Sequence, residues 1–312
     1  MNDTKSYHLT RLTPESSSGL RSFSKFFPVE IVTLAYIFIT TIYLTVFVGR
    51  LEAPLVYFAI RFGVTALILL LVWLYNTRRN PIVGFIRYFL PFALLSYWYP
   101  ETYYIGEFIF PNMDQRLYTI EQTLFGCQLS MEFSKLMPWA WFSELMYFGY
   151  FSYYFIFFGT ALWCYLKDRE SANRAVFMFV GSFYLYYIVF IVFPAAGPQF
   201  FPALFPPPLN HVPDGYIFCN IMRFLQAMGE RPTGAFPSSH VGITFTVVIF
   251  IYLHCRHLLK FALPLFVILV FSTVYIKAHY AIDAIGGLVS VAVTYPLVSW
   301  MYTEIKKGAN AP

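Results

Sequence analysis

Long apolar runs are the feature that most restricts how this chain can fold. A helix that spans a bilayer needs about 20 apolar residues, and the sequence offers eight candidates. In chain order they cover Val29–Gly49, Leu55–Tyr75, Ile82–Tyr99, Phe142–Leu166, Ala175–Phe193, Val241–Leu253, Phe261–Ile276 and Ala281–Tyr302. The sixth and seventh are short, and come closer to spanning length when extended back to Ser238 and Lys260. Runs of this length predict an all-α, polytopic membrane bundle of about eight transmembrane helices.

The amino-acid composition agrees with this expectation. Of the 312 residues 58% are hydrophobic and only 12% are charged, whereas a soluble domain carries about 25% charged residues. No Gly-rich nucleotide loop, carboxylate cluster or His/Cys spacing indicates a metal or another cofactor. Among the four cysteines, Cys127 and Cys219 fall in connections predicted to lie outside, which allows a disulfide. Small apolar packing residues are the better explanation.

The chain divides into a short polar tail and one membrane domain. Residues 1–27 are mostly polar and lack an apolar core, so they are predicted to form a disordered cytoplasmic tail rather than a cleaved signal peptide. Residues 28–312 are predicted to be a single membrane domain. Within it we distinguish the N-terminal helices (28–99), an outer interfacial segment (100–141) and a C-terminal core (142–303).

Two long connections are predicted on the outer side. Residues 100–141 combine acidic residues with many aromatic ones and should hold one or two helices in the membrane interface, where Trp and Tyr are favoured. Residues 195–235 begin with Gly197-Pro198 and cannot form a continuous helix. We expect them to fold over the mouth of the site and to contribute to substrate choice.

The distribution of basic residues predicts the orientation of the helices. Five segments are rich in them: the tail (Lys5, Arg11, Arg21, Lys25), three connections (Arg78, Arg79, Arg87; Lys167, Arg169, Arg174; Arg256, Lys260) and the C-terminus (Lys306, Lys307). The alternate connections carry far fewer. By the positive-inside rule, both termini are cytoplasmic. The segments Gly234–His240 and His279–Asp283 then lie together on the non-cytoplasmic side.

Those two segments carry the candidate chemistry. An ionisable group at the edge of a bilayer is costly and marks a functional site by default. His279 and Asp283 are four residues apart, which on a helix puts them on one face, and an Asp that holds one imidazole nitrogen makes the other a better nucleophile. With His240 as general acid, the set suits covalent phosphoryl transfer. The structural alternatives are a hydrogen bond that pins a helix start and an interfacial position for His240.

The motifs resemble those of a known family. Phe236-Pro237-Ser238-Ser239-His240 resembles the Pro-Ser-x-His motif of the type 2 phosphatidic acid phosphatase (PAP2) superfamily, and His279 and Asp283 match its His-x-x-x-Asp motif. The resemblance covers about Pro194 to Gly287 and makes residues 142–303 a PAP2-like catalytic core. It implies that His279 forms a phosphohistidine, that Asp283 orients it, and that His240 serves as acid and then as base.

Two departures from the superfamily pattern bear on the substrate. The last motif usually opens with Ser-Arg, and the corresponding positions here are Ser272-Thr273, so the phosphate-binding arginine is missing. The first motif, a Lys six residues ahead of Arg-Pro, is also absent, because Phe224 stands in its place. With these two departures and the stretch Phe193–Pro198, the chain is more similar to the branch that contains inositol phosphorylceramide synthase and sphingomyelin synthase.

The resemblance implies a function at the membrane surface. It implies a multi-pass enzyme that hydrolyses a phosphate ester of a phospholipid at the extracytoplasmic face. The first alternative is a headgroup phosphotransferase resembling inositol phosphorylceramide synthase, and the second is a non-catalytic transporter or scaffold with the same fold. The expected partners are a phospholipid or phosphosphingolipid and the bilayer, with no nucleic acid; the sequence does not indicate an oligomeric state.

Phosphate binding is expected near the start of the sixth apolar run. A helix N-terminus offers unpaired N–H groups to an anion, and glycine lets the backbone approach closely. The expected phosphate ligands are Ser238, Ser239, Gly234, Arg231 and Lys277, with Arg223 as a further candidate, and Gln199 is expected to bind the substrate. The two serines also suit helix capping, and Lys277 also suits a snorkelling position at the interface.

Overall fold

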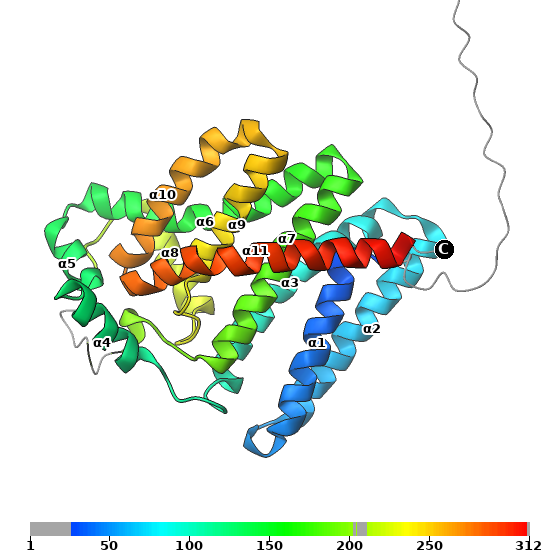
Figure 1. Ribbon diagram of the computed structural model, residues 1–312, viewed down its shortest axis with the longest axis horizontal. Coiled ribbons are helices and arrows are strands. Elements are labelled where there is room, and N and C mark those ends of the chain that lie inside the picture. Colours follow the sequence, from blue (N-terminus) through cyan, green and yellow to red (C-terminus); the bar gives the residue numbers. More distant parts are fainter. Residues whose placement is uncertain (1–25, 202–203, 205–210, 311–312) are drawn as a thin grey trace, which may run out of the picture.

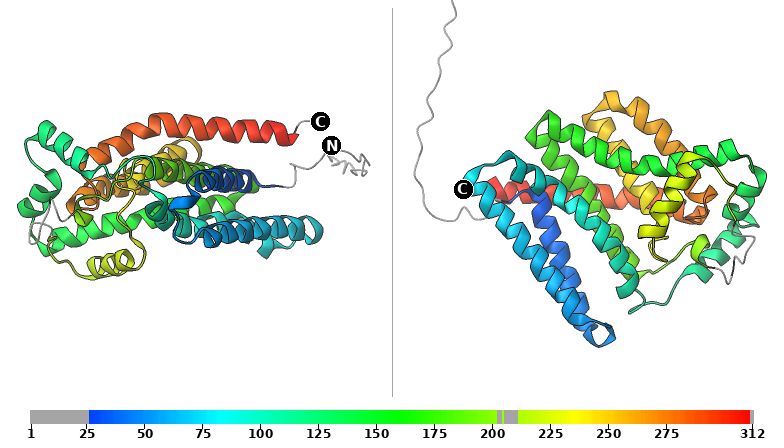
Figure 2. Two further views of the ribbon diagram at one scale, coloured as in Figure 1. Left: turned by 90° about the horizontal axis from the view of Figure 1, so that it is seen from below. Right: turned by 180° about the vertical axis from the view of Figure 1, so that it is seen from behind.

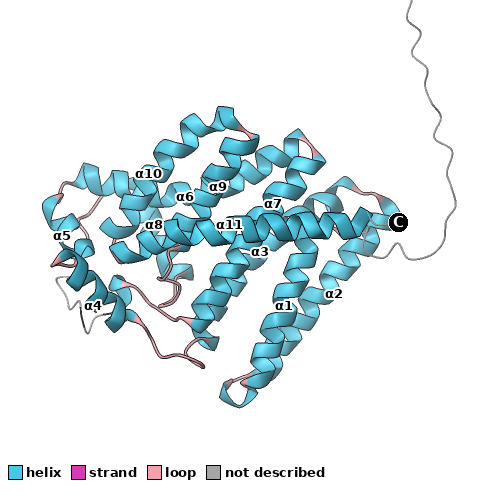
Figure 3. Cartoon of the chain, viewed as in Figure 1, coloured by secondary structure: helices cyan, strands magenta, loops and turns pink. Residues whose placement is uncertain are grey.

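The computed structural model describes residues 26–201, 204 and 211–310, and within them every regular element is a helix (Figure 3). The all-α prediction is therefore confirmed. The proposed N-terminal tail lies outside the described residues except for Phe26 and Phe27. The division of the chain into a tail and a membrane domain of three segments, the last of them the C-terminal core, stays a prediction.

Seven helices in the described part of the chain are long and apolar enough to cross a membrane. They are α1 (Pro28–Val46), α2 (Pro54–Arg78), α3 (Pro81–Ile105), α6 (Ala140–Lys167), α7 (Arg169–Val192), α10 (Leu259–Tyr275) and α11 (Ala281–Asn310). The remaining apolar run forms α9 (Ser239–His254), a shorter apolar helix of 16 residues. The protein is a multi-pass integral membrane protein, as predicted.

Helix α3 corrects one predicted boundary. The apolar run was expected to end at Tyr99. Pro100 follows it, and proline lacks the N–H that a helix interior uses. The helix instead continues through Pro91 and Pro100 to Ile105. Trp98, Glu101 and Ile105 in this last part are all buried, so packing against neighbouring helices offsets the lost backbone hydrogen bond.

Helix α7 forms the centre of the bundle. It packs against α1, α3, α6, α9 and α11, and Figure 1 shows α11 crossing over it while α1 and α2 form a hairpin to one side. Its residues are buried on most sides, including Phe177, Phe179 and Phe190, which are fully buried. Such an all-round apolar helix is typical of the core of a membrane bundle.

The two long connections contain short helices. Residues 100–141 hold α4 (Asp114–Phe125) and α5 (Leu129–Leu136), and the connection after α7 holds the short 3₁₀ helix η3 (Pro198–Phe200) and α8 (Ile217–Gly229). Figure 1 shows α4 and α5 beside the N-terminal end of α11, and contacts of α4 with α11 and of α5 with α10 agree. These connections thus pack around the end of the bundle where the candidate residues lie.

The predicted cytoplasmic segments lie at the other end of the bundle. Lys306 at the end of α11 contacts Glu170 at the start of α7, with Nζ and Oε2 2.6 Å apart. Arg174 contacts His254 at the end of α9, with 3.4 Å between Nη1 and Nε2. Figure 2 shows the end of α11 near the start of α1. The basic ends therefore share one side, as the charge pattern requires, while their orientation in the membrane stays a prediction.

The cysteines do not form the disulfide that the sequence allowed. Cys127 and Cys219 both have free thiols, as do Cys164 and Cys255. The last three are buried among apolar side chains. They serve as small packing residues, the alternative that the sequence favoured.

Candidate active site

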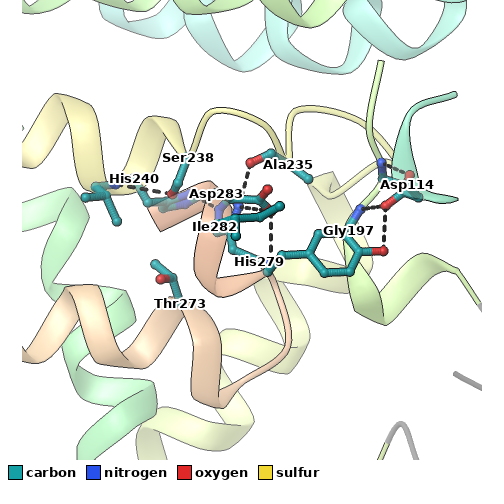
Figure 4. A network of polar contacts seen from close by, with 12 residues as sticks. Asp114, Gly197, Ala235, Ser238, His240, Thr273, His279, Ile282 and Asp283 are labelled. Atoms are coloured by element: carbon teal, nitrogen blue, oxygen red, sulfur yellow. Dashed lines mark hydrogen bonds and ion pairs between the residues drawn. The ribbon is translucent and has the colours of Figure 1, made fainter. Parts of the chain in front are cut away.

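Two histidines from distant parts of the chain meet at one point (Figure 4). His240 lies in the first turn of α9, and His279 lies in the loop just before α11. Nε2 of His279 is 3.4 Å from Nδ1 of His240, although 39 residues separate them in the sequence. Two imidazoles at this separation can act on the same substrate atom or on atoms bonded to it.

The starts of α9 and α11 are held together by short contacts between their backbones. Ser238 caps α9, because its hydroxyl accepts a hydrogen bond from the Val241 N–H, and its own N–H donates to the Asp283 carbonyl at 3.0 Å. The helices can approach this closely because residue 287 is glycine: a Cβ there would lie 2.6 Å from the Ser238 carbonyl oxygen. Capping at one helix thus fixes the position of both histidines.

A backbone carbonyl sets the tautomer of His279. Nδ1 of His279 lies 2.8 Å from the Ala235 carbonyl oxygen, which can only accept a hydrogen bond. Nδ1 therefore carries the proton, and Nε2 presents its lone pair toward His240. The preceding residue, Gly234, has φ of 79°, a left-handed conformation that favours glycine. This turn places the Ala235 carbonyl beside the ring.

Asp283 is close to His279 but does not hold it as the sequence suggested. Its Oδ2 is 3.6 Å from His279 Nδ1, too long for a hydrogen bond, and instead accepts the Tyr280 N–H at 2.8 Å. The reason is that α11 begins only at Ala281, so His279 and Asp283 do not share a helical face. Asp283 caps the helix start and leaves a buried carboxyl group next to the imidazole.

Burial sets the charge state of the nucleophile candidate. His279 is only 4% exposed, and this burial lowers its pKa to about 4, although the Ala235 hydrogen bond and the charge of Glu230 act in the other direction. The ring is therefore neutral at physiological pH. A neutral imidazole with a free Nε2 lone pair is the form that a nucleophile needs.

Two tyrosine rings of α6 pack against His240. The Tyr150 ring stacks on it with 4.5 Å between centroids, and the Tyr153 ring lies at the same distance with a tilt of 45°. These ring contacts fix the orientation of the His240 imidazole beside His279.

The histidines border a small cavity of about 20 Å³. The residues that line it include Gly234, Ala235, Ser239, Gln199 and Glu230. Of the expected phosphate and substrate ligands, Gly234, Ser239 and Gln199 are therefore brought to the site, and Ser238 supports it as the buried cap of α9.

The expected basic ligands lie elsewhere. Lys277 is buried and its Nζ donates to the Ser134 hydroxyl of α5 at 2.7 Å; burial lowers its pKa to about 8. Lys277 adopts φ of 64°, a tight turn that sends its side chain away from His279. Arg231 does not line the cavity and donates to the Glu230 carbonyl. Arg223 pairs with Asp214.

The position of the missing motif arginine is occupied by Thr273. The side chain is fully buried and its hydroxyl donates to the Val270 carbonyl. Its own carbonyl accepts the His279 N–H at 3.1 Å. Thr273 therefore supports the loop that carries His279 but supplies no charge for a phosphate.

Two carboxylates of α4 support the site, and sequence reasoning gave them no role. Asp114 accepts the N–H groups of Ala196 and Gly197, at 2.6 and 2.8 Å, as well as the Tyr280 hydroxyl (Figure 4). Glu121 accepts the Ile282 N–H at the start of α11. Both residues are fully buried. Their spacing of seven residues, two turns of one helix face, is the signal that could have identified them.

The comparisons with known proteins agree with the motifs. Residues 115–297, more than half of the chain, match the family model described as the PAP2 superfamily. This range contains His240, His279 and Asp283. No curated protein and no solved structure matches the chain. The match is to the superfamily, and the likeness to its inositol phosphorylceramide synthase branch stays a prediction.

Proposed function

Because this chain belongs to the PAP2 superfamily, whose membership points to phosphatase or phosphotransferase chemistry, we propose that it cleaves a phosphate ester of a membrane lipid through a phosphohistidine on His279. The observation that carries this proposal is the pair of imidazole nitrogens 3.4 Å apart beside a cavity. A neutral His279 with Nε2 unprotonated is ready to attack phosphorus. The rings separate to admit the phosphoryl group.

In the first step the Nε2 lone pair of His279 forms a bond to phosphorus. The ester P–O bond breaks, and the leaving alcohol oxygen takes a proton from His240. The phosphorylated His279 ring gains positive charge and keeps its Nδ1 proton, which the Ala235 carbonyl accepts at 2.8 Å. The Asp283 carboxylate at 3.6 Å stabilises that charge.

In the second step His240, now neutral, takes a proton from the acceptor. With water as the acceptor, its oxygen attacks phosphorus, the P–N bond breaks, and inorganic phosphate leaves. This hydrolysis is the proposed activity. The topology predicted from the basic residues places it at the extracytoplasmic face of the membrane.

Transfer of a headgroup to a lipid hydroxyl is the second candidate, and the lining of the cavity favours it. A phosphate monoester carries up to two negative charges, whereas a phosphodiester carries one. Among the described residues that line the small cavity there is no Lys or Arg, and there is one carboxyl group, that of Glu230. Because nothing in this lining balances a second negative charge, a phosphodiester is the easier substrate to bind. A non-catalytic transporter or scaffold is the remaining alternative.

The test is to incubate purified protein with labelled phosphatidic acid, phosphatidylinositol or ceramide plus a phospholipid donor. Release of phosphate identifies hydrolysis, and a labelled phosphosphingolipid identifies transfer. We expect His279→Ala to abolish both, and we expect His257→Ala, in the short 3₁₀ helix η4 (Arg256–Leu258) that follows α9, to retain them. Activity that persists in the His279→Ala protein would overturn the proposed mechanism.

A further inference from the structure

A second, larger cavity adjoins the first. It has a volume of about 270 Å³ and shares Tyr99, Tyr150, Glu230, Ser239 and His240 with the small cavity. His279 borders only the small one. The acid–base candidate therefore faces both spaces, while the nucleophile candidate faces one.

The two ends of the larger cavity differ in chemistry. Its inner end is apolar and is formed by α3, α6 and α7 through Phe92, Leu95, Phe157 and Phe183. Near His240 the wall is polar, with Tyr150, Tyr153, Tyr154, Gln226 and Glu230. A dry cavity of about 150 Å³ already accommodates benzene, so this space can hold a longer apolar group with one polar end.

The cavity reaches the surface of the bundle between α3 and α6. Tyr154 of α6 is 40% exposed and Ser96 of α3 is also exposed, and both line the cavity. Residues Met222 and Gln226 of α8 form part of the outer wall, while Phe224 and Met228 of the same helix are exposed. An apolar molecule can thus reach the cavity from outside the bundle, past the exposed Ser96 and Tyr154.

Charge selects what the cavity can hold. Glu230 borders it, and no Lys or Arg does so among the described residues. Burial raises the pKa of Glu230, although the hydrogen bond from Gln199 opposes the change. An anionic group placed here either meets a like charge or requires the carboxyl group to take up a proton, and both cost free energy.

We propose that this cavity is a lipid-alcohol site: it binds an uncharged, hydroxyl-bearing amphiphile with its chain in the apolar end and its oxygen at His240. The role of this site in the reaction rests on the proposed function. When the ester P–O bond breaks, the alcohol oxygen takes the His240 proton and the alcohol occupies this site. In a transfer reaction an acceptor alcohol occupies it and gives its proton to His240.

The first experiment requires no turnover. A photoreactive long-chain alcohol is added to the purified protein in lipid nanodiscs, and the labelled peptides are identified by mass spectrometry. We expect labels on α3, α6 and α8. Ser96→Phe, which narrows the opening, should strongly reduce them, whereas Ala93→Phe, on the same helix but outside the cavity, should not.

The same probe tests the role of charge. A fatty acid of equal chain length should compete poorly in the wild type and better in Glu230→Gln, which keeps the shape of the side chain and removes its charge. Labels confined to other surfaces, or a fatty acid that competes as well as the alcohol in the wild type, would overturn the proposal. Because labelling is independent of catalysis, it can succeed even when the proposed function fails.

A kinetic experiment follows if turnover is found. For a long-chain phosphate ester, Ser96→Phe should raise KM about tenfold, as expected when about two methylene groups lose their burial. For a short water-soluble ester kcat/KM should be unchanged, and Ala93→Phe should affect neither ester. Incorporation of labelled alcohol into product identifies an acceptor, and product inhibition without incorporation identifies the leaving alcohol. An equal effect of Ser96→Phe on both esters contradicts the site.

Discussion

At the scale of single residues, the reactive geometry depends on a backbone group. The Ala235 carbonyl fixes the proton on Nδ1 of His279, a task that a carboxylate performs in many catalytic sites. Asp283 lies close enough to act through its charge but is hydrogen-bonded to the Tyr280 N–H. Orientation and charge stabilisation are therefore divided between two residues, and mutation can separate them.

We expect Asp283→Asn to lower kcat by about 10²-fold with little change in KM, less than the roughly 10⁴-fold loss that follows when a carboxylate alone sets the tautomer. The substitution removes the charge near Nδ1, while the amide oxygen can still accept the Tyr280 N–H. Steady-state kinetics with a labelled lipid substrate provides the measurement. A loss as large as that of His279→Ala would show that Asp283, and not Ala235, controls the ring.

The lowered pKa of His279 makes stability depend on pH. Its pKa is about 4 in the folded protein against 6.5 for the ordinary side chain, so the unfolded chain binds more protons between these values. Stability therefore falls as pH drops from 6.5 to 4, by about 3 kcal/mol for this one group. His279→Asn should flatten that part of the profile, which thermal unfolding in detergent measures. An identical pH profile in the variant would contradict the assignment.

At the scale of helices, two buried ion pairs tie the N-terminal helices to α3. Arg61 of α2 makes a bidentate pair with Glu101, with N–O distances of 2.8 and 2.7 Å, and Arg87 pairs with Glu30 of α1 at 2.6 Å. All four side chains are buried. In an apolar environment such a charge is tolerated only with its partner.

Removing one partner of the Arg61–Glu101 pair should therefore be more harmful than removing both. We expect Arg61→Leu to destabilise the protein by about 3–5 kcal/mol, because it leaves Glu101 buried and unpaired. The double variant Arg61→Leu/Glu101→Leu should recover most of the loss, and Arg50→Leu, at an exposed position, serves as the control. The measurement is the unfolding midpoint of each variant in detergent. Equal losses in the single and double variants would argue against this pairing.

The helices of the outer connections act as a frame for the site. Asp114 of α4 accepts hydrogen bonds from the backbone of residues 196–197, and Glu121 of α4 accepts one from the start of α11. Ser134 of α5 accepts a hydrogen bond from Lys277. This explains why a basic residue two positions before His279 does not serve the cavity. Its charge is used to anchor the loop to α5.

At the scale of the whole molecule, the bundle has two chemically different ends. The basic ends of α7 and α11 meet at one end, and α4, α5 and the start of α11 lie toward the other. A catalytic group at one membrane face can act only on headgroups exposed there. The orientation of the bundle therefore determines which leaflet supplies the substrate.

The predicted orientation can be tested with single-cysteine variants in a cysteine-free background. Gln115→Cys, exposed on α4, should react with a membrane-impermeant maleimide applied to intact cells. Lys307→Cys, near the end of α11, should react only after the membrane is permeabilised. Labelling is read by mass shift on a gel. The reverse pattern, or reaction of both sites from one side, would refute the orientation inferred from the positive-inside rule.

Much of the fold could be predicted because it depends on near neighbours in the chain. Each apolar run became a helix, since backbone groups in lipid must bond within their own segment. The end of α3 was misplaced because the burial of Glu101 and Ile105 depends on other helices. The spacing of His279 and Asp283 indicated their closeness but assumed one continuous helix, whereas α11 begins two residues after His279.

Hydropathy, basic residues and two histidine motifs were thus sufficient to predict a helical membrane protein with a PAP2-type pair of imidazoles. Each of these signals comes from residues that are close together in the chain. The partner of each side chain was not predictable in this way. That Ala235 sets the His279 tautomer, that Lys277 turns to α5 and that Glu230 borders both cavities follows from the packing of α4, α5, α8, α9 and α11. Contacts between segments so far apart depend on the three-dimensional arrangement of the helices.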